Sequence, residues 1–206
     1  LAIYGYAHLP HMFRAQRQIP DQDLPSAEQK LALLGLAVEK LSAAGYRYIG
    51  MDHFALPEDD LAQAQQRGGL HRNFMGYTTH AQTDLVGLGV SAISHVGDSF
   101  CQNHRDLPEW EAAIDAGRLP VWRGLMLEAD DVLRADVIQR LMCQGEIDYE
   151  AVERSHGIVF GDYFREAIDA LAPLVQDGLA QVLPDRIQVT SRGRALLRIM
   201  AMRFDR

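Results

Sequence analysis

The sequence predicts an α/β fold that is followed by a mostly helical, winged-helix-like unit. Leu1–Ala7 alternates apolar and small residues as a strand does, a helical pattern follows, and Tyr46–Phe54 reads as a second strand. The order strand, helix, strand predicts a parallel βαβ unit. After about Asn103 the character of the chain changes, and from Glu128 onward helical patterns dominate.

Local signals set the limits of the first elements. His8-Leu9-Pro10 ends the first strand, because proline keeps the preceding residue out of helical geometry. Arg14–Arg17 follows as a loop or short helix. Ser26 and Gln29 have the spacing of a capping box at a helix start, and Gly45 is a suitable stop.

The middle of the chain combines one more helix with a polar, glycine-rich stretch. A helix is expected over Pro57–Arg67, closed by Gly68-Gly69. Within the stretch that follows, Leu70–Asp98, the nearly continuous apolar run Leu85–Ser94 predicts a strand covered on both faces. A short helix over Leu107–Ala116 comes next.

The C-terminal part predicts three helices, a hairpin and a last helix. The expected elements are helices at Asp130–Cys143, Tyr149–Ser155 and Tyr163–Val175, a hairpin of Leu179–Leu183 and Arg186–Thr190 around Pro184-Asp185, and a helix over Ser191–Phe204. This order suggests a winged helix and raises DNA binding as a hypothesis. The arginines of the last helix are interleaved with an apolar stripe, which is typical of a packing helix with a solvated face.

Composition excludes some classes of function. The chain has 206 residues, 48% hydrophobic and 23% charged, as in ordinary globular domains. A net charge of −8 argues against general affinity for nucleic acid or anionic membranes. The two cysteines, Cys101 and Cys143, make neither a disulfide framework nor a common zinc site, and we expect a cytoplasmic protein. Because the chain opens on Leu1 within an apparent strand, we expect it to be part of a longer protein.

Asp52 and His53 are the first candidate site residues. They stand near the C-terminal end of an expected strand, where α/β folds place their sites. Neighbours on a strand point to opposite faces, so the two are not expected to form a dyad. The alternative is a structural histidine beside a turn aspartate.

His71, Arg72, Asn73 and Tyr77 form the second group of candidates. We expect a loop after the Gly-Gly turn, from which these side chains line a pocket. Arg72, together with Arg14 and Arg17, could bind carboxylates through two hydrogen bonds from each guanidinium. The alternative is a solvated loop that caps neighbouring backbone.

Other common sites lack support in the sequence. The histidines show no His-x-x-x-His pair with a nearby glutamate, so no histidine metal site is predicted. Cys101 with His104 is a weak signal for a nucleophile, and Gly-x-Ser-x-Gly is absent.

Several segments together resemble one known family. They are Tyr6-Ala7-His8-Leu9-Pro10, Ile49-Gly50-Met51-Asp52-His53-Phe54-Ala55, Leu70-His71-Arg72-Asn73-Phe74 with Gly76-Tyr77-Thr78-Thr79, Gly89-Val90-Ser91-Ala92-Ile93-Ser94, Trp122-Arg123-Gly124, Asp148-Tyr149 and Val189-Thr190-Ser191-Arg192-Gly193-Arg194. In this order they resemble the oxygen-independent coproporphyrinogen III oxidases. The resemblance covers about the C-terminal half of such a protein.

The resemblance implies a function and a fold. Such enzymes use a [4Fe–4S] cluster and two S-adenosylmethionine molecules in heme biosynthesis. A 5′-deoxyadenosyl radical starts the oxidative decarboxylation of two propionates of coproporphyrinogen III to vinyl groups, which gives protoporphyrinogen IX. The implied architecture is the C-terminal portion of a partial α/β radical-SAM barrel, with its pocket-lining loops, over residues 1–120, and a winged-helix-like domain over 121–206.

The resemblance also assigns site residues. It implies that Ala7 touches the second S-adenosylmethionine and Ile93 the first. The family's Cys-x-x-x-Cys-x-x-Cys motif is absent from this sequence, so no metal ligands are assigned here, and we expect this chain alone to hold no cofactor and to be inactive. Met75 stands where glutamine is common in the family, which puts a polar contact there in doubt.

Two further expectations concern alternatives and partners. The competing function is a non-catalytic heme chaperone of the same radical-SAM class; the His-Arg-Asn-Phe segment at His71–Phe74 favours the oxidase. We expect coproporphyrinogen III as substrate of the full-length protein, and neither nucleic acid nor membrane as partner. The full-length protein is expected to be a monomer, whereas exposed strand edges of this chain would favour self-association.

Overall fold

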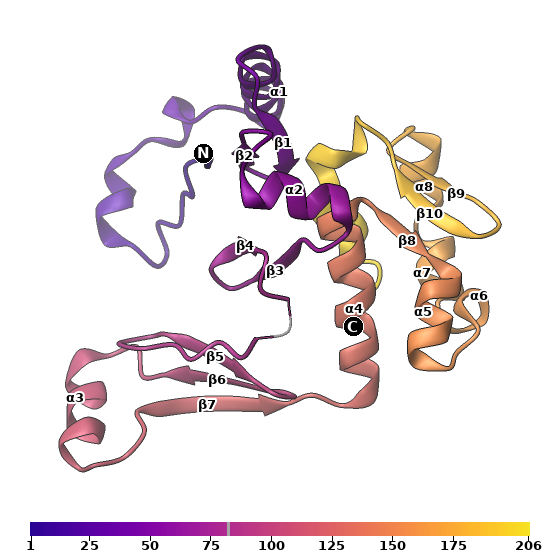
Figure 1. Ribbon diagram of the computed structural model, residues 1–206. Helices are drawn as coiled ribbons and strands as arrows, with labels where there is room; N and C mark the ends of the chain where they lie inside the picture. The colour runs from indigo at the N-terminus through magenta and orange to yellow at the C-terminus, as the bar shows by residue number, and fades with distance from the viewer. Residues whose placement is uncertain (82) are drawn as a thin grey trace.

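Helices and short antiparallel sheets are mixed along the whole chain (Figure 1). The structure is a computed structural model and describes residues 1–81 and 83–206. Its first elements are η1 Arg14–Gln18, η2 Asp21–Asp23, α1 Ala27–Ala43, β1 Arg47–Gly50, β2 His53–Ala55, α2 Asp60–Arg67, β3 His71–Asn73 and β4 Gly76–Thr78. The middle elements are β5 Ile93–Val96, β6 Ser99–Asn103, α3 Leu107–Asp115 and β7 Val121–Met126. The C-terminal elements are α4 Ala129–Gln144, β8 Glu146–Asp148, α5 Tyr149–His156, α6 Phe160–Tyr163, α7 Arg165–Asp169, α8 Ala172–Gln176, β9 Ala180–Val182, β10 Arg186–Val189, η3 Gly193–Leu196 and α9 Leu197–Ala201.

The strand expected at Leu1–Ala7 is wrong in extent. Ala2 forms one isolated antiparallel bridge with His53, and the amide of Ile3 donates to the carbonyl of Asp52 at 2.8 Å. The residues after Ile3 are not assigned to a strand. Strand β2 is only three residues long, so it offers too short an edge for seven residues to pair.

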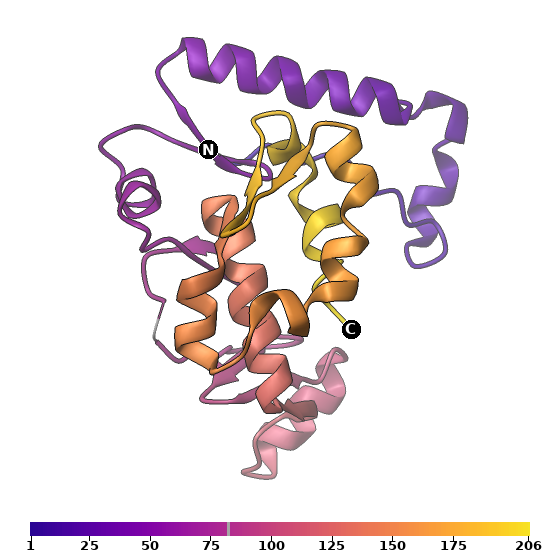
Figure 2. The ribbon, with the colours of Figure 1, turned by 90° about the vertical axis from the view of Figure 1, so that its right-hand side faces the viewer.

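Helix α1 begins and ends where the sequence indicates. Ser26 Oγ accepts a hydrogen bond from the amide of Gln29, and the Gln29 side chain accepts from the amide of Ser26, so the capping box is confirmed. Gly45, with a φ of 88°, follows the helix end. No residue of α1 is buried, and the helix lies across the top of the molecule in Figure 2.

The expected strand Tyr46–Phe54 is two strands. β1 and β2 pair antiparallel, with Arg47 opposite Ala55, and the chain reverses at Met51, whose φ is 54°. The expected parallel βαβ unit is therefore wrong: every strand pairing among the described residues is antiparallel. The residue pattern did not show this reversal, because the turn at Met51-Asp52 lies inside the run Tyr46–Phe54 that reads as a single strand.

Helix α2 was expected to begin at Pro57 but begins three residues later, at Asp60. The side chain of Asp59 caps it by accepting from the amide of Leu61 at 2.8 Å, and Gly68 ends it with a φ of 76°. The next residues form a β3–β4 hairpin with Arg72 opposite Tyr77. The loop expected at His71–Asn73 is therefore a strand.

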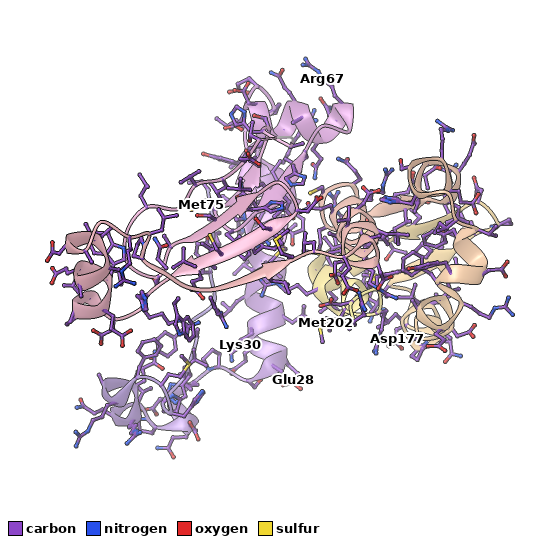
Figure 3. All side chains as sticks on the ribbon, turned by 90° about the horizontal axis from the view of Figure 1, so that it is seen from below. Glu28, Lys30, Arg67, Met75, Asp177 and Met202 are labelled. Atoms are coloured by element: carbon purple, nitrogen blue, oxygen red, sulfur yellow. The ribbon has the colours of Figure 1, made fainter. Side chains whose placement is uncertain are left out.

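The strand expected at Leu85–Ser94 lies later, at β5. Val86 and Leu88 are 65% and 88% exposed, so this run is not covered on both faces. β5, β6 and β7 form an antiparallel sheet, of which the sequence indicated neither β6 nor β7. Seen from below, this sheet and α3 extend away from the C-terminal elements around Asp177, the residue that follows α8 (Figure 3).

The C-terminal elements enclose the larger core. The α4 and α5 helices and the hairpin β9–β10 are confirmed, and β8 adds a third strand to the hairpin in the order β8-β10-β9. The helix expected at Tyr163–Val175 is divided into α6, α7 and α8, and the last helix is reduced to η3 and α9. Phe160, Phe164 and Phe204 pack together at the centre of this core.

Helix α4 connects this core to a smaller one. Val137 and Leu141 on α4 are fully buried in the larger core, whereas Cys143 at the end of the same helix belongs to the smaller core with Ile49 and Tyr77. In Figure 1 the helix runs through the centre of the molecule, between the N-terminal elements and the C-terminal unit. It is therefore the support on which the β3–β4 hairpin rests.

Candidate functional site

The β3–β4 hairpin is fixed to helix α4 by two side chains. Tyr77 Oη donates to the carbonyl of Met142 at 3.0 Å. Gln139 on α4 accepts from the amide of Arg72 at 3.1 Å and donates to the carbonyl of the same residue. Burial raises the pKa of Tyr77 well above its usual range, so the hydroxyl stays protonated and remains a donor.

Asp52 and His53 form a hydrogen-bonded pair. His53 Nδ1 lies 2.7 Å from Asp52 Oδ1, and each side chain is 18% exposed. The expectation that they do not form a dyad is wrong, because Asp52 lies in the β1–β2 turn and not within a strand. This contact holds Nδ1 and leaves Nε2 beside the backbone of Gly76.

Four of the predicted residues thus come together. The His53 ring meets the Tyr77 ring edge-to-face at 5.3 Å between centroids, and the Arg72 guanidinium lies 5.9 Å from the Tyr77 ring centroid. Arg72 Nε is buried without a hydrogen-bond partner among the described residues. Asp52, His53, Arg72 and Tyr77 are therefore one contiguous cluster on the side of the hairpin that faces α4.

His71 and Asn73 lie on the opposite face of β3, as the two-residue period of a strand requires. They line a cavity of about 180 Å³ together with His80, Asp84, Leu85 and His95. Burial, and next the neighbouring His95, lower the pKa of His71. The structure therefore separates the six pocket candidates into two groups.

Ile93 opens β5 and stands opposite Gln102 of β6. The loop before it is held by buried polar side chains. Ser94 Oγ accepts from the amide of Gly87 at 2.9 Å, Asn103 Nδ2 donates to the carbonyl of Gly89 at 2.9 Å, and Gln102 Nε2 donates to the carbonyl of Ser91 at 3.1 Å. A Cβ on Gly87 would lie 2.6 Å from the carbonyl oxygen of Ile93, so this approach requires glycine.

Ala7 is exposed, and its carbonyl accepts from Gln16 Nε2 at 3.1 Å. Arg17 is engaged nearby, because its Nε donates to the carbonyl of Pro10 at 2.9 Å. The neighbouring Ile3–Tyr6 segment lines a larger, mostly apolar cavity of about 730 Å³ against α1, Met51 and α9. Among the arginines considered for a carboxylate, only Arg72 lies in the cluster described above.

Sequence reasoning missed the residues that hold these parts in place. Gln139 clamps β3 from 67 positions away in the chain, and Gln102 and Asn103 fasten the loop at Gly87–Ser91. A glutamine on a helix and polar residues in an unrecognised strand carry no local signal for such roles.

The residues present do not fit an iron–sulfur cluster. Among residues 1–81 and 83–206, no group of three or more His, Cys, Asp or Glu side chains is placed to hold a metal ion. Cys143 is buried, which raises the pKa of its thiol to about 12, and Cys101 lies on β6. We therefore derive no chemical step through a cluster from this chain.

None of the helices in the described part of the chain is both long and apolar enough to cross a membrane. The chain thus offers a rigid hairpin, an anchored loop and two cavities.

Comparison with known proteins first gives the class. A family model described as the HemN C-terminal domain matches residues 127–196, from just before α4 to the end of η3. A solved structure described as "Coproporphyrinogen III oxidase (HemN) from Escherichia coli is a Radical SAM enzyme" matches with a TM-score of 0.94 and 49% identity, over 99% of this chain and 47% of that one.

Curated relatives then give the particular group. The chain is 50% identical to "Oxygen-independent coproporphyrinogen III oxidase" of Salmonella typhimurium, 49% to that of Escherichia coli and 50% to that of Pseudomonas aeruginosa. Each match covers 100% of this chain and 45% of the relative, so the chain spans less than half the length of these curated relatives. The chain is thus a relative of the oxygen-independent coproporphyrinogen III oxidases and corresponds to their C-terminal part.

Proposed function

We propose that this chain is the C-terminal part of an oxygen-independent coproporphyrinogen III oxidase. In its full-length form the protein would decarboxylate two propionates of coproporphyrinogen III to vinyl groups, giving protoporphyrinogen IX. The observation that carries the proposal is 50% identity over the whole chain to relatives with that name. The TM-score of 0.94 adds that the arrangement of elements is also shared.

The proposed cofactors are a [4Fe–4S] cluster and two S-adenosylmethionine molecules, and they supply the radical that starts the reaction. The family's Cys-x-x-x-Cys-x-x-Cys motif is absent from this sequence, so we assign the cluster to parts of the full-length protein outside this chain. Ala7 and Ile93 are proposed to contact S-adenosylmethionine. Their small or apolar side chains suit contacts through backbone or van der Waals packing, and the anchored loop before Ile93 makes a stable wall for such a contact.

The proposed architecture has two parts. Residues 1–120 would be the end of a partial α/β barrel, and 121–206 a winged-helix-like domain. The three-stranded sheet β8-β10-β9 beside α4 and α5 supports the second part. Strand β7, Val121–Met126, pairs with β6 and therefore lies in the same sheet as β5. The family model begins at residue 127, just after this strand. Both facts favour a boundary a few residues after the proposed one at 120/121.

The remaining parts of the proposal concern the cell and partners. We propose a cytoplasmic, monomeric full-length enzyme that takes neither nucleic acid nor membrane as partner. This chain alone would be inactive and would self-associate, because Leu31, Leu33 and Leu36 on α1 are about half exposed beside the incompletely paired segment Leu1–Ala7.

The test is an anaerobic assay of the full-length protein. Reductant, S-adenosylmethionine and coproporphyrinogen III are supplied, and vinyl products are measured by chromatography. We expect conversion by the full-length protein and none by this chain alone. Stable heme binding without any vinyl product would instead support the heme chaperone and refute the oxidase.

A further inference from the structure

The cavity beneath β3 has no assigned role in the proposed function. It lies between the β3–β4 hairpin and the start of the β5–β7 sheet, and its walls carry His71, Asn73, His80, Asp84, Leu85 and His95. Its volume of about 180 Å³ is too small for a whole tetrapyrrole but sufficient for one short acidic arm.

The three imidazoles in this cavity make no ring hydrogen bond among residues 1–81 and 83–206. The ring hydrogen bonds made within the described residues belong to His53, His104 and His156. The rings of His71, His80 and His95 take part in none of them. Stacking on Phe100, with 4.1 Å between ring centroids, holds the His95 ring in place.

The polar groups of the walls are mainly donors. Asn73 Oδ1 accepts from the amide of Met75 at 2.8 Å, which orients the side-chain amide, and Nδ2 remains as a donor that has no partner within the described part of the chain. Each imidazole offers an N–H in either protonation state. Asp84 is the one carboxylate in the wall, and its Oδ1 already accepts from the amide of Gly97 at 2.9 Å. A set of donors around a small space matches an oxyanion.

A metal ion does not fit this cavity. No three His, Cys, Asp or Glu side chains of the described residues converge closely enough to hold one. Leu85, in contrast, provides an apolar contact for the methylene groups of an acidic arm. The cavity is thus better suited to a carboxylate on a short alkyl chain than to a cation.

We infer that this cavity binds one propionate carboxylate of the substrate, with His71, Asn73 and His95 as the donors. The inference rests on the proposed function for the identity of the substrate. The hairpin that carries His71 and Asn73 is fixed to α4 by Tyr77 and Gln139, so the donors are held in place before the ligand arrives.

The first experiment tests the cavity without any catalysis. This chain, labelled at its histidine rings, is titrated with sodium propionate at constant ionic strength and followed by NMR. We expect saturable shifts of the His71 and His95 ring signals with one common dissociation constant, and smaller, linear shifts at His104, which lies outside the cavity. Methylammonium chloride should give no saturable shift. Shifts of equal size at His71, His95 and His104, or no saturation with propionate, would overturn the inference.

The second experiment uses the full-length enzyme. His71→Phe and His95→Phe each keep a ring and remove its N–H, so each should raise the KM for coproporphyrinogen III about tenfold, with kcat within about twofold, because a hydrogen bond to a charged group is lost on binding. His104→Phe, outside the cavity wall, is the matched control and should leave both constants unchanged. An active wild type with unchanged KM in both variants would refute the carboxylate site and leave the proposed function intact. An inactive wild type would refute the proposed function, whereas the NMR titration would still decide the cavity.

Discussion

Replacing Tyr77 with phenylalanine tests whether its hydroxyl fixes the β3–β4 hairpin to helix α4. The ring would remain against His53 and Arg72, so only the hydrogen bond to the carbonyl of Met142 is removed. Met142 lies in the last turn of α4, which ends at Gln144, and its carbonyl is among the last four, which have no partner within a helix. Tyr77 supplies that partner from outside the helix.

The expected loss follows from the burial of this bond. Tyr77 is only 9% exposed, so water does not readily replace the lost donor. A buried carbonyl left without its partner costs about 1–3 kcal/mol, and we expect Tyr77→Phe to lower the free energy of unfolding by about 2 kcal/mol. The change should appear as a lower urea midpoint with an unchanged slope.

The control and the pH dependence sharpen the test. Tyr4→Phe removes the hydroxyl of a residue that is 70% exposed and should change the free energy of unfolding by less than about 0.5 kcal/mol. Because burial raises the pKa of Tyr77, the folded state keeps its proton when the unfolded state loses it near pH 10. The stability from this group is therefore complete below pH 10 and is lost as the pH rises above it. Tyr77→Phe should show a shallower alkaline loss than the wild type. Equal stability of the two proteins at pH 7 would refute the proposed anchor.

Three further substitutions test separate parts of the structure. Gly193→Ala should lower the free energy of unfolding by about 3 kcal/mol or more in urea, because the new Cβ would lie 1.9 Å from the carbonyl oxygen of Leu179. The control Gly161→Ala places its Cβ in open space and should change the free energy of unfolding by less than about 0.5 kcal/mol. Similar losses for both variants would contradict this account. Ser26→Ala removes the capping box and should lower the stability of α1 by about 1 kcal/mol. The loss should appear as faster hydrogen exchange of the amides in the first turn of α1. Unchanged exchange would exclude a capping role for Ser26. Asn103→Ala should lower the free energy of unfolding by about 1–3 kcal/mol and speed hydrogen exchange of the Ser91 amide, because Asn103 Nδ2 donates to the carbonyl of Gly89. Exchange as slow as in the wild type would show that Gln102 and Ser94 hold the loop without Asn103.

Local chemistry explains which elements were predictable. The capping box at Ser26 and the glycines after α1 and α2 act within one turn, so the limits of those helices are encoded nearby. The hairpin around Pro184-Asp185 is local for the same reason. The identity of the family also came from the sequence, since its motifs depend on residue types in order.

Pairing between distant segments explains the failures. The single strand expected at Tyr46–Phe54 is instead the antiparallel pair β1–β2, because Met51 has a left-handed backbone conformation and the chain reverses there. The strand expected at Leu85–Ser94 is instead found at β5, Ile93–Val96, where β6 provides the neighbouring edge. A strand is stable only where a neighbouring edge exists, and that edge is a property of the whole fold.

The sequence alone singled out the candidate pocket residues: His71, Arg72, Asn73 and Tyr77 in one segment, and Asp52-His53 in another. Only the tertiary structure decided how they are grouped. The pleat of β3 places Arg72 with Tyr77 and His53 on the α4 side and turns His71 and Asn73 into the cavity beside His95. The physical reason is that a strand directs successive side chains to opposite faces, while the partner on each face comes from a distant part of the chain.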